Sequence, residues 1–128
     1  MGQQQLLLIV LGVIIVGIAV VVGINVFTAS SSQANRDGVI SDLTNLASLA
    51  QQFYRKPAAL GGGSNTFTGW TLPAALDTTG NGTYTITVAA QSVTIVGTGN
   101  ENGNNGSSAV KATMIVGPND ITSTTINN

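Results

Sequence analysis

The fold is decided by the stretch from Leu6 to Ile24, which reads LLLIVLGVIIVGIAVVVGI and holds no polar or charged side chain. As a helix, a run of this length spans roughly 28 Å, close to the thickness of the hydrocarbon core of a bilayer. A helix that is apolar on all sides must be surrounded by lipid or by protein. The first charged residue of the chain is Arg36. The stretch therefore predicts a helix buried in a membrane or in a bundle of helices.

The amino-acid composition excludes several classes of function. The 128 residues include four Lys and Arg, five Asp and Glu, no His and no Cys. Histidine bases, thiolate nucleophiles, zinc and iron–sulfur ligands and disulfides are therefore excluded. A net charge of −1 excludes nucleic-acid binding through a basic surface. We expect a structural protein that is not an enzyme and that uses no cofactor and no metal.

Three other interpretations of the apolar run fit less well. A cleaved secretory signal has a shorter apolar region behind a positive segment, whereas residues 1–5 carry no Lys or Arg. The remaining residues are too few to enclose such a helix on every side in a soluble core. A myristoylated N-terminus needs Ser or Thr where this chain has Leu6. Burial in lipid or among helices is the prediction that remains.

The helix is predicted to continue past the apolar run, because neither Pro nor Gly follows Asn25 until Gly38. One helix from Gln3 to Lys56 would be about 80 Å long. Bends are expected at Gly38 and in the Ser30–Ser32 run. Two helices joined by a Ser-rich linker are the alternative.

In the second half of this helix, apolar residues recur every three or four positions, which is typical of an amphipathic helix. Arg55 and Lys56 suit its last turn, and Pro57 ends it. The apolar face is formed by Val39, Leu43, Leu46, Ala50 and Phe53.

Residues 57–128 are predicted to form loops and short antiparallel strands. Alternating apolar residues indicate strands near residues 84–90, 93–95 and 110–116, and the short segment 121–126 is expected to add an edge strand. The Asn- and Gly-rich residues 97–108 are predicted to form a long polar loop. Such a sheet is too small to be stable alone, so it needs the amphipathic helix face as its partner. The strand residues predicted to meet that face are Ile86, Val88, Ile95 and Met114.

The predicted fold class is α+β. A long N-terminal helix has a protruding apolar half, and its amphipathic half packs on a small sheet of three or four antiparallel strands. Three segments follow from this: a transmembrane or protruding half at residues 1–28, an amphipathic half at 29–56 and a sheet-containing head at 57–128.

This layout resembles the type IV pilin superfamily, which includes the pseudopilins of type II secretion. The resemblance is carried by QLLLIVLGVIIVGIAVVVGINVF at residues 5–27 and by SDLTNLASLAQQFYRKP at residues 41–57. It implies a pilin-like fold and a bacterial subunit that is inserted in the inner membrane and then extracted into a filament. Prepilin peptidase and the pilus assembly machinery would be its partners.

The resemblance leaves the N-terminal register open. Met1 and Gly2 are either the remainder of a basic leader, cleaved before Gln3, or the start of the mature chain. The family usually has Glu at mature position five, where this chain has Gln5 or, counted from Gln3, Leu7. Pairing of that Glu with a neighbour's N-terminal amine is therefore in question here.

Filament formation also follows from physics, because a helix apolar on all sides can be satisfied by lipid or by copies of itself. Ala19 and Gly23 form a small face for close helix packing, while Gly12 and Gly17 allow close packing or local melting of a helix that lacks the family's usual Pro. A repeated contact that does not close gives a helical polymer. The predicted filament core comprises Leu6, Leu7, Leu8, Ile9, Leu11, Ile14, Ile15, Ile18, Val21, Ile24 and Phe27.

The predicted function is therefore the structural subunit of an extracellular cell-surface filament used in adhesion, surface motility or DNA uptake. A pseudopilin of a secretion system and a single-span membrane-anchored binding module are the alternatives.

Few other motifs carry chemistry. Asp42 is expected on a solvated helix face, and Trp70 is expected to pin the loop that contains it. Asn81-Gly82-Thr83 and Asn105-Gly106-Ser107 match the N-glycosylation sequon, so Asn81 and Asn105 are candidate glycosylation sites.

Overall fold

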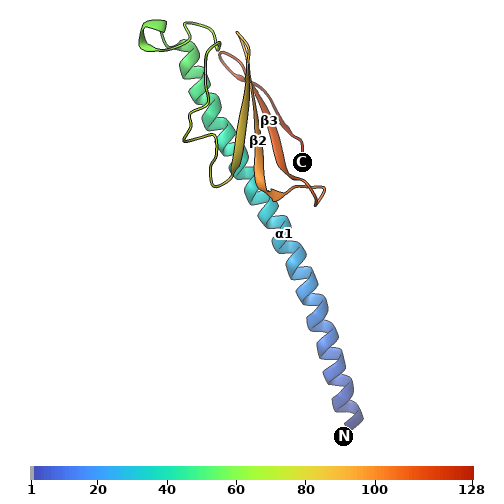
Figure 1. Cartoon of the computed structure of the whole chain (residues 1–128). Helices are drawn as coiled ribbons and strands as arrows, with labels where there is room; N and C mark the ends of the chain where they lie inside the picture. The colour runs from blue at the N-terminus through green and yellow to red at the C-terminus, as the bar shows by residue number, and fades with distance from the viewer. Residues whose placement is uncertain (1) are drawn as a thin grey trace. The chain divides into compact units, whose positions relative to one another are not determined.

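The computed structural model describes residues 2–128, which form one long helix followed by a four-stranded sheet (Figure 1). The helix is α1 (Gly2–Arg55), and a short 3₁₀ turn, η1 (Ala58–Leu60), comes after it. The chain divides after Ser31 into two compact units. Residues 2–31 contain only the beginning of α1, while Ser32–Asn128 holds the rest of α1 and the sheet. The strands are β1 (Gly82–Val88), β2 (Val93–Asn102), β3 (Ala109–Val116) and β4 (Ile121–Ile126).

The long helix is confirmed with ends within one residue of those predicted. It stops before Pro57, whose ring cannot continue the helical hydrogen-bond pattern. Helical structure also continues through Gly38, where a bend was expected. A Cβ atom at Gly38 would lie 2.6 Å from Oδ1 of Asn81, so glycine there allows close contact between α1 and the loop before β1.

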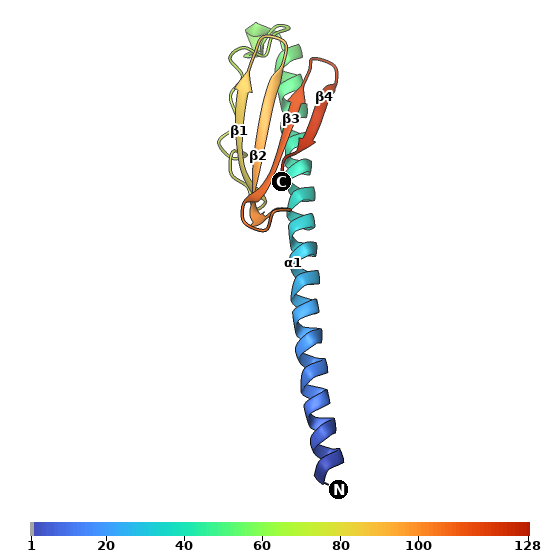
Figure 2. The same cartoon turned by 90° about the vertical axis from the view of Figure 1, so that its right-hand side faces the viewer.

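The sheet is a meander in which each strand pairs antiparallel with the next, in the order β1-β2-β3-β4 (Figure 2). A tight turn joins β1 to β2, with the amide of Ala89 donating to the carbonyl of Ser92 over 2.8 Å. Consecutive pairing needs only short connections, so the sheet forms from contacts local in the sequence.

One face of the sheet packs on the second half of α1 to form the core. Val39, Leu43 and Ala50 are completely buried there, as are Val93 and Ile95 of β2. The fold class is thus confirmed: a long N-terminal helix packs, through its later part, on a small antiparallel sheet. Three residues predicted for this core are only partly buried at its margin, namely Phe53, Ile86 and Val88.

The prediction of a polar loop at residues 97–108 is wrong in its first half, because β2 continues to Asn102. Glycines at 97 and 99 break the apolar alternation that marks a strand. They are needed because α1 crosses β2 at this point: a Cβ on Gly97 would lie 2.7 Å from Cγ1 of Val39, and one on Gly99 would collide with the side chain of Asn35. Because close contact with α1 requires glycine at these two positions, the apolar alternation that would have indicated a strand is missing.

The loop before β1 also contributes to the core. Trp70 is 7% exposed and Phe67 is completely buried. The amide of Phe67 donates to the carbonyl of Ala90 over 2.9 Å, and its ring lies 4.8 Å from that of Tyr54. The loop is therefore pinned by two aromatic residues rather than by Trp70 alone.

Candidate assembly surface

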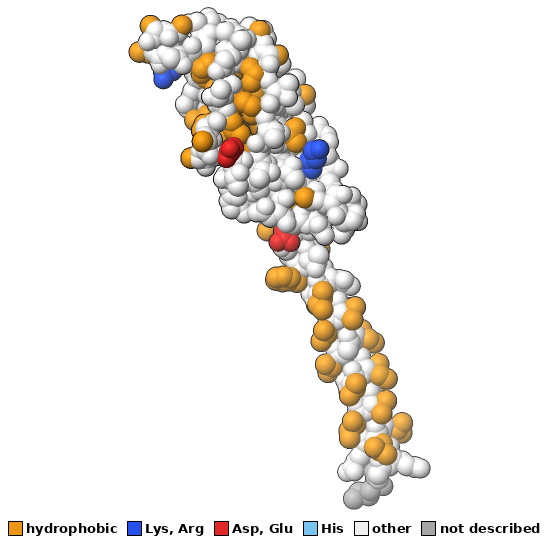
Figure 3. Space-filling model, viewed as in Figure 1, with side chains coloured by type: hydrophobic (Ala, Val, Ile, Leu, Met, Phe, Trp, Pro, Cys, Tyr) orange, Lys and Arg blue, Asp and Glu red, His pale blue; other side chains and the backbone are white. Residues whose placement is uncertain are grey.

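The apolar part of α1 is exposed on all sides. Its large side chains range from 52% exposed at Ile14 to 75% at Phe27, and its most apolar 18-residue window has no buried residue. Figure 3 shows hydrophobic side chains along this part of the helix on the side in view. All residues predicted for a filament core lie in this exposed set: Leu6, Leu7, Leu8, Ile9, Leu11, Ile14, Ile15, Ile18, Val21, Ile24 and Phe27.

Such a surface is unfavourable in water, because full burial of one Leu, Ile or Val side chain contributes roughly 1.5–3 kcal/mol. The helix is long and apolar enough to cross a membrane, and it is the one such helix among residues 2–128. Its length and composition are consistent with membrane insertion. Its backbone hydrogen bonds are internal, so lipid and a bundle of similar helices are both suitable surroundings.

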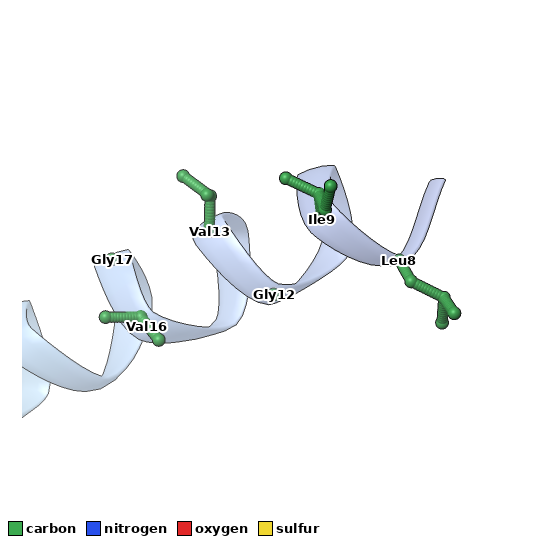
Figure 4. Close-up of a pocket in the computed structure, with 6 residues that line it drawn as sticks. All are labelled: Leu8, Ile9, Gly12, Val13, Val16 and Gly17. Carbon is green, nitrogen blue, oxygen red and sulfur yellow. The ribbon is translucent and has the colours of Figure 1, made fainter. Parts of the chain in front are cut away.

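The glycines of this segment leave open space on the helix surface. A Cβ atom added at Gly12, Gly17 or Gly23 would meet no atom within 4 Å apart from the adjacent residues and the local helix backbone. Ala19 and Gly23 are four residues apart and so lie on the same helix face. Figure 4 shows Gly12 and Gly17 among the aliphatic side chains that line a shallow pocket on this part of α1. The pocket is lined by Leu8, Ile9, Gly12, Val13, Val16 and Gly17.

At the N-terminus, Gly2, Gln3 and Gln5 belong to α1 and are exposed. The first turn contains no acidic residue. The positive end of the helix dipole favours a negative group. Gln3 and Gln5 are uncharged, so they offer only the dipoles of their side-chain amides there. Met1, which was also considered for the processing register, lies outside the described residues.

Polar side chains fasten the start of the second unit to the ends of the strands. Ser32 donates to the carbonyl of Asn102 over 2.6 Å, and the side-chain amide of Asn35 donates to the carbonyl of Asn81 over 2.7 Å. Arg36 is 7% exposed and donates to Oδ1 of Asn104 over 2.8 Å. These contacts fix the polar segment of α1 to the sheet immediately after the division at Ser31.

The expectation that Asp42 lies on a solvated face is wrong. Its Oδ2 accepts hydrogen bonds from Thr79 Oγ1 at 2.8 Å, from Asn81 Nδ2 at 3.1 Å and from the hydroxyl of Tyr84. Burial raises the pKa of Asp42, but these hydrogen bonds together outweigh burial and hold its pKa below the usual value. Burial and the bond to Asp42 raise the pKa of Tyr84, so its hydroxyl stays a donor. The cluster ties α1 to β1.

The two sequon asparagines lie in different surroundings. Asn81 uses its side-chain nitrogen, the atom that would carry a glycan, to donate to Asp42. Asn105 is exposed in the turn between β2 and β3, where its Oδ1 accepts from the amides of Ser107 and Ser108. The side-chain nitrogen of Asn105 is thus the more accessible of the two.

Across residues 2–128, no three His, Cys, Asp or Glu side chains gather where they could hold a metal ion. The candidate surface of this molecule is the uncharged, exposed part of α1. Sequence patterns located that surface because its composition is so uniform. They missed the Asp42 cluster, since its partners come from β1 and the loop before it, far away in the sequence.

No protein-family model matches this chain, and neither the curated proteins nor the solved structures contain a match. The arrangement itself is pilin-like: a long N-terminal helix, apolar in its first half, packs through its second half on a small antiparallel sheet.

Proposed function

We propose that this chain is the structural subunit of an extracellular helical filament of the type IV pilus kind. The observation that carries the proposal is the apolar part of α1, which has no partner within the described chain and no charge. Its surface is satisfied when copies of the same segment pack together in the axis of a filament. The unit Ser32–Asn128, called the head from here on, would form the outer surface of the filament.

The energetics of assembly support this role over a permanent anchor. Moving the helix from lipid into a bundle exchanges one apolar environment for another, so the transfer meets no large hydrophobic barrier. Dispersion contacts between Leu, Ile and Val side chains, with close approach at Ala19 and Gly23, then favour the bundle. A head-to-tail contact that repeats without closing produces an open helical polymer.

The proposed life cycle has two stages. The chain is first inserted in the inner membrane through α1, where prepilin peptidase and the assembly machinery act on it. It is then extracted into a filament at the cell surface, for adhesion, surface motility or DNA uptake. The role is structural rather than enzymatic.

The test is to shear cells that produce the chain, image the supernatant by electron microscopy and identify the fibre protein by mass spectrometry. Micrometre-long fibres made of this chain would support the proposal. Short fibres confined to the cell envelope would indicate a secretion pseudopilus instead. Chain found solely as a monomer in the membrane fraction would contradict both, and would indicate a membrane-anchored module.

A variant sharpens this test. Gly23→Leu places a bulky side chain on the small face that Gly23 forms with Ala19. The segment remains apolar enough to insert in the membrane. We expect normal amounts in the membrane fraction and a reduced fibre yield. Gly23→Ala, which keeps a small residue at the same position, is the matched control and should retain a fibre yield close to that of the wild type.

A further inference from the structure

The two edges of the sheet differ in how they are covered. The β1 edge meets the preceding loop, through a bridge between Thr78 and Thr83 and a 2.8 Å hydrogen bond from the amide of Tyr84 to the carbonyl of Asp77. β4 is the last strand of the sheet, and within residues 2–128 it pairs with β3 alone. Figure 2 shows β4 at one side of the sheet with no other element along its outer edge.

This open edge carries neither the charged side chains nor the proline that often keep edge strands from pairing with other chains. Natural proteins place Lys, Pro or inward-pointing charges there. β4 reads ITSTTI, with no charge and no Pro, and five of its six residues are exposed. Two copies of such a strand would meet without electrostatic repulsion.

Exposed apolar side chains of the head also gather on β4. In the described unit Ser32–Asn128, large hydrophobic residues are exposed at three positions: Leu60, Ile121 at 39% and Ile126 at 48%. Two of the three therefore lie at opposite ends of the edge strand β4.

An irregularity in the pairing with β3 places both isoleucines on one face. Ile121 pairs with Val116 and Ile126 pairs with Ala112, and both of these β3 residues are buried on the side of the sheet that faces α1. Strict alternation would put residues 121 and 126 on opposite faces. The register shift beside Val116 adds one residue to β4 and removes this conflict. Thr124, opposite buried Met114, shares the face and lies midway between the isoleucines.

We propose that β4 pairs antiparallel with β4 of a second copy of this chain, around a two-fold axis at Thr124. Ile121 of each copy then lies opposite Ile126 of the other on the shared face, and Ser123 lies opposite Thr125 on the other face. Such apolar and hydroxyl cross-strand pairs stabilise antiparallel sheets. The contact is isologous, since the same strand serves both copies.

The symmetry of this contact determines what it joins. A two-fold axis perpendicular to the sheet makes the two heads point in opposite directions. Successive subunits of a polar filament all point the same way, so β4 pairing would link separate chains or neighbouring filaments side by side. It stands independently of the proposed function, because it concerns only the head.

The test uses the full chain in detergent and exploits its lack of cysteine. A Thr124→Cys substitution puts one thiol at the two-fold axis, where the Cα atoms of an antiparallel pair are about 4.5–5.5 Å apart, within the range that a disulfide spans. The matched control is Thr85→Cys, at an exposed threonine of β1. Under mild oxidation we expect roughly tenfold more disulfide-linked dimer from Thr124→Cys than from Thr85→Cys.

A second substitution checks that pairing of the strand causes the cross-link. Adding Ile126→Lys to the Thr124→Cys chain should reduce the dimer roughly tenfold, since two lysines would enter the contact. Circular dichroism of the reduced chains establishes that each is folded. Equal dimer from Thr124→Cys and Thr85→Cys would overturn the proposal even if the lysine variant failed to fold, and so would dimer that persists in a folded lysine variant.

Discussion

The two halves of α1 are continuous in sequence and differ in how their apolar residues are arranged. From Leu6 to Phe27 the apolar residues cover every side of the helix and remain exposed. Between Arg36 and Ala50 buried positions recur every three or four residues, and the sheet covers them. The arrangement of apolar residues around the helix thus indicates where the partner lies. A single stripe finds its partner within the chain, whereas a helix apolar on all sides needs partners from outside.

The largest effect is expected from a charge placed in the first half. Ile14→Asp puts a carboxylate in the middle of the apolar segment, where removing it from water costs several kcal/mol. Fibre yield after shearing should fall by roughly a hundredfold or more. The melting temperature of the head should be unchanged, because Ile14 is 52% exposed. Abundant fibres of this variant would show that the segment is not buried among copies of itself.

Shortening a buried side chain in the second half of α1 should instead lower the stability of the head. Leu43 is completely buried under the sheet, so Leu43→Ala should lower the free energy of unfolding of the head by about 2–5 kcal/mol. Leu7→Ala is the matched control, because Leu7 is 69% exposed. Thermal melts followed by circular dichroism in detergent measure both. Equal stability of the two variants would contradict the packing of this helix face on the sheet.

Glycine substitutions in the apolar half of α1 and in the head should differ in the same direction, but by less. Gly97→Ala forces a methyl group against Val39 and Tyr84, and such overpacking should lower the stability of the head by about 1–3 kcal/mol. Gly12→Ala places the same methyl group in open space, so head stability should not change. Chemical denaturation of the two variants side by side checks this, and a neutral Gly97→Ala would mean that α1 and β2 are farther apart than described.

The smallest effect concerns the Asp42 cluster, and it depends on pH. Hydrogen bonds hold the folded pKa of Asp42 below its unfolded value of about 3.9, so its contribution to stability is complete above about pH 4 and is lost as pH falls further. Asp42→Asn should lower stability at pH 7 by about 1 kcal/mol. It should also weaken the acid dependence below pH 4. Thermal melts from pH 2 to pH 7 measure this. If Asp42→Asn loses as much stability at low pH as the wild type, other carboxylates cause the acid dependence.

Phe53 shows how a sequence-based estimate changes once burial is known. A fully buried phenylalanine replaced by alanine costs about 3–5 kcal/mol. Phe53 is only partly buried at the margin of the core, so a smaller loss is expected.

Much of the fold could be predicted because its signals are local and periodic. The apolar run and the apolar stripe from Val39 to Ala50 defined α1, alternation defined three strands, and the short segment 121–126 was expected to add a fourth at the edge. The extension of β2 was missed because Gly97 and Gly99 serve a contact with α1 that sequence periodicity cannot register. What Phe67 packs against could not be specified, because an aromatic in a Gly- and Thr-rich loop has no apolar periodicity around it.

The candidate assembly surface could be predicted in composition but not in arrangement. A helix apolar on all sides identifies its residues without specifying which of them face each neighbour. The Asp42 cluster is invisible in sequence, because its partners Thr79, Asn81 and Tyr84 are 37–42 residues away. The unprotected edge of β4 could be located in sequence, but the common face of Ile121 and Ile126 required the register of the pairing.

Helical reconstruction by electron cryomicroscopy of sheared, detergent-free material would reveal what surrounds the apolar segment of α1. We predict fibres in which the side chains from Leu6 to Phe27 contact the same segment of neighbouring copies, with no phospholipid around them. Dispersed single chains whose N-terminal helix is still coated with phospholipid would contradict this prediction.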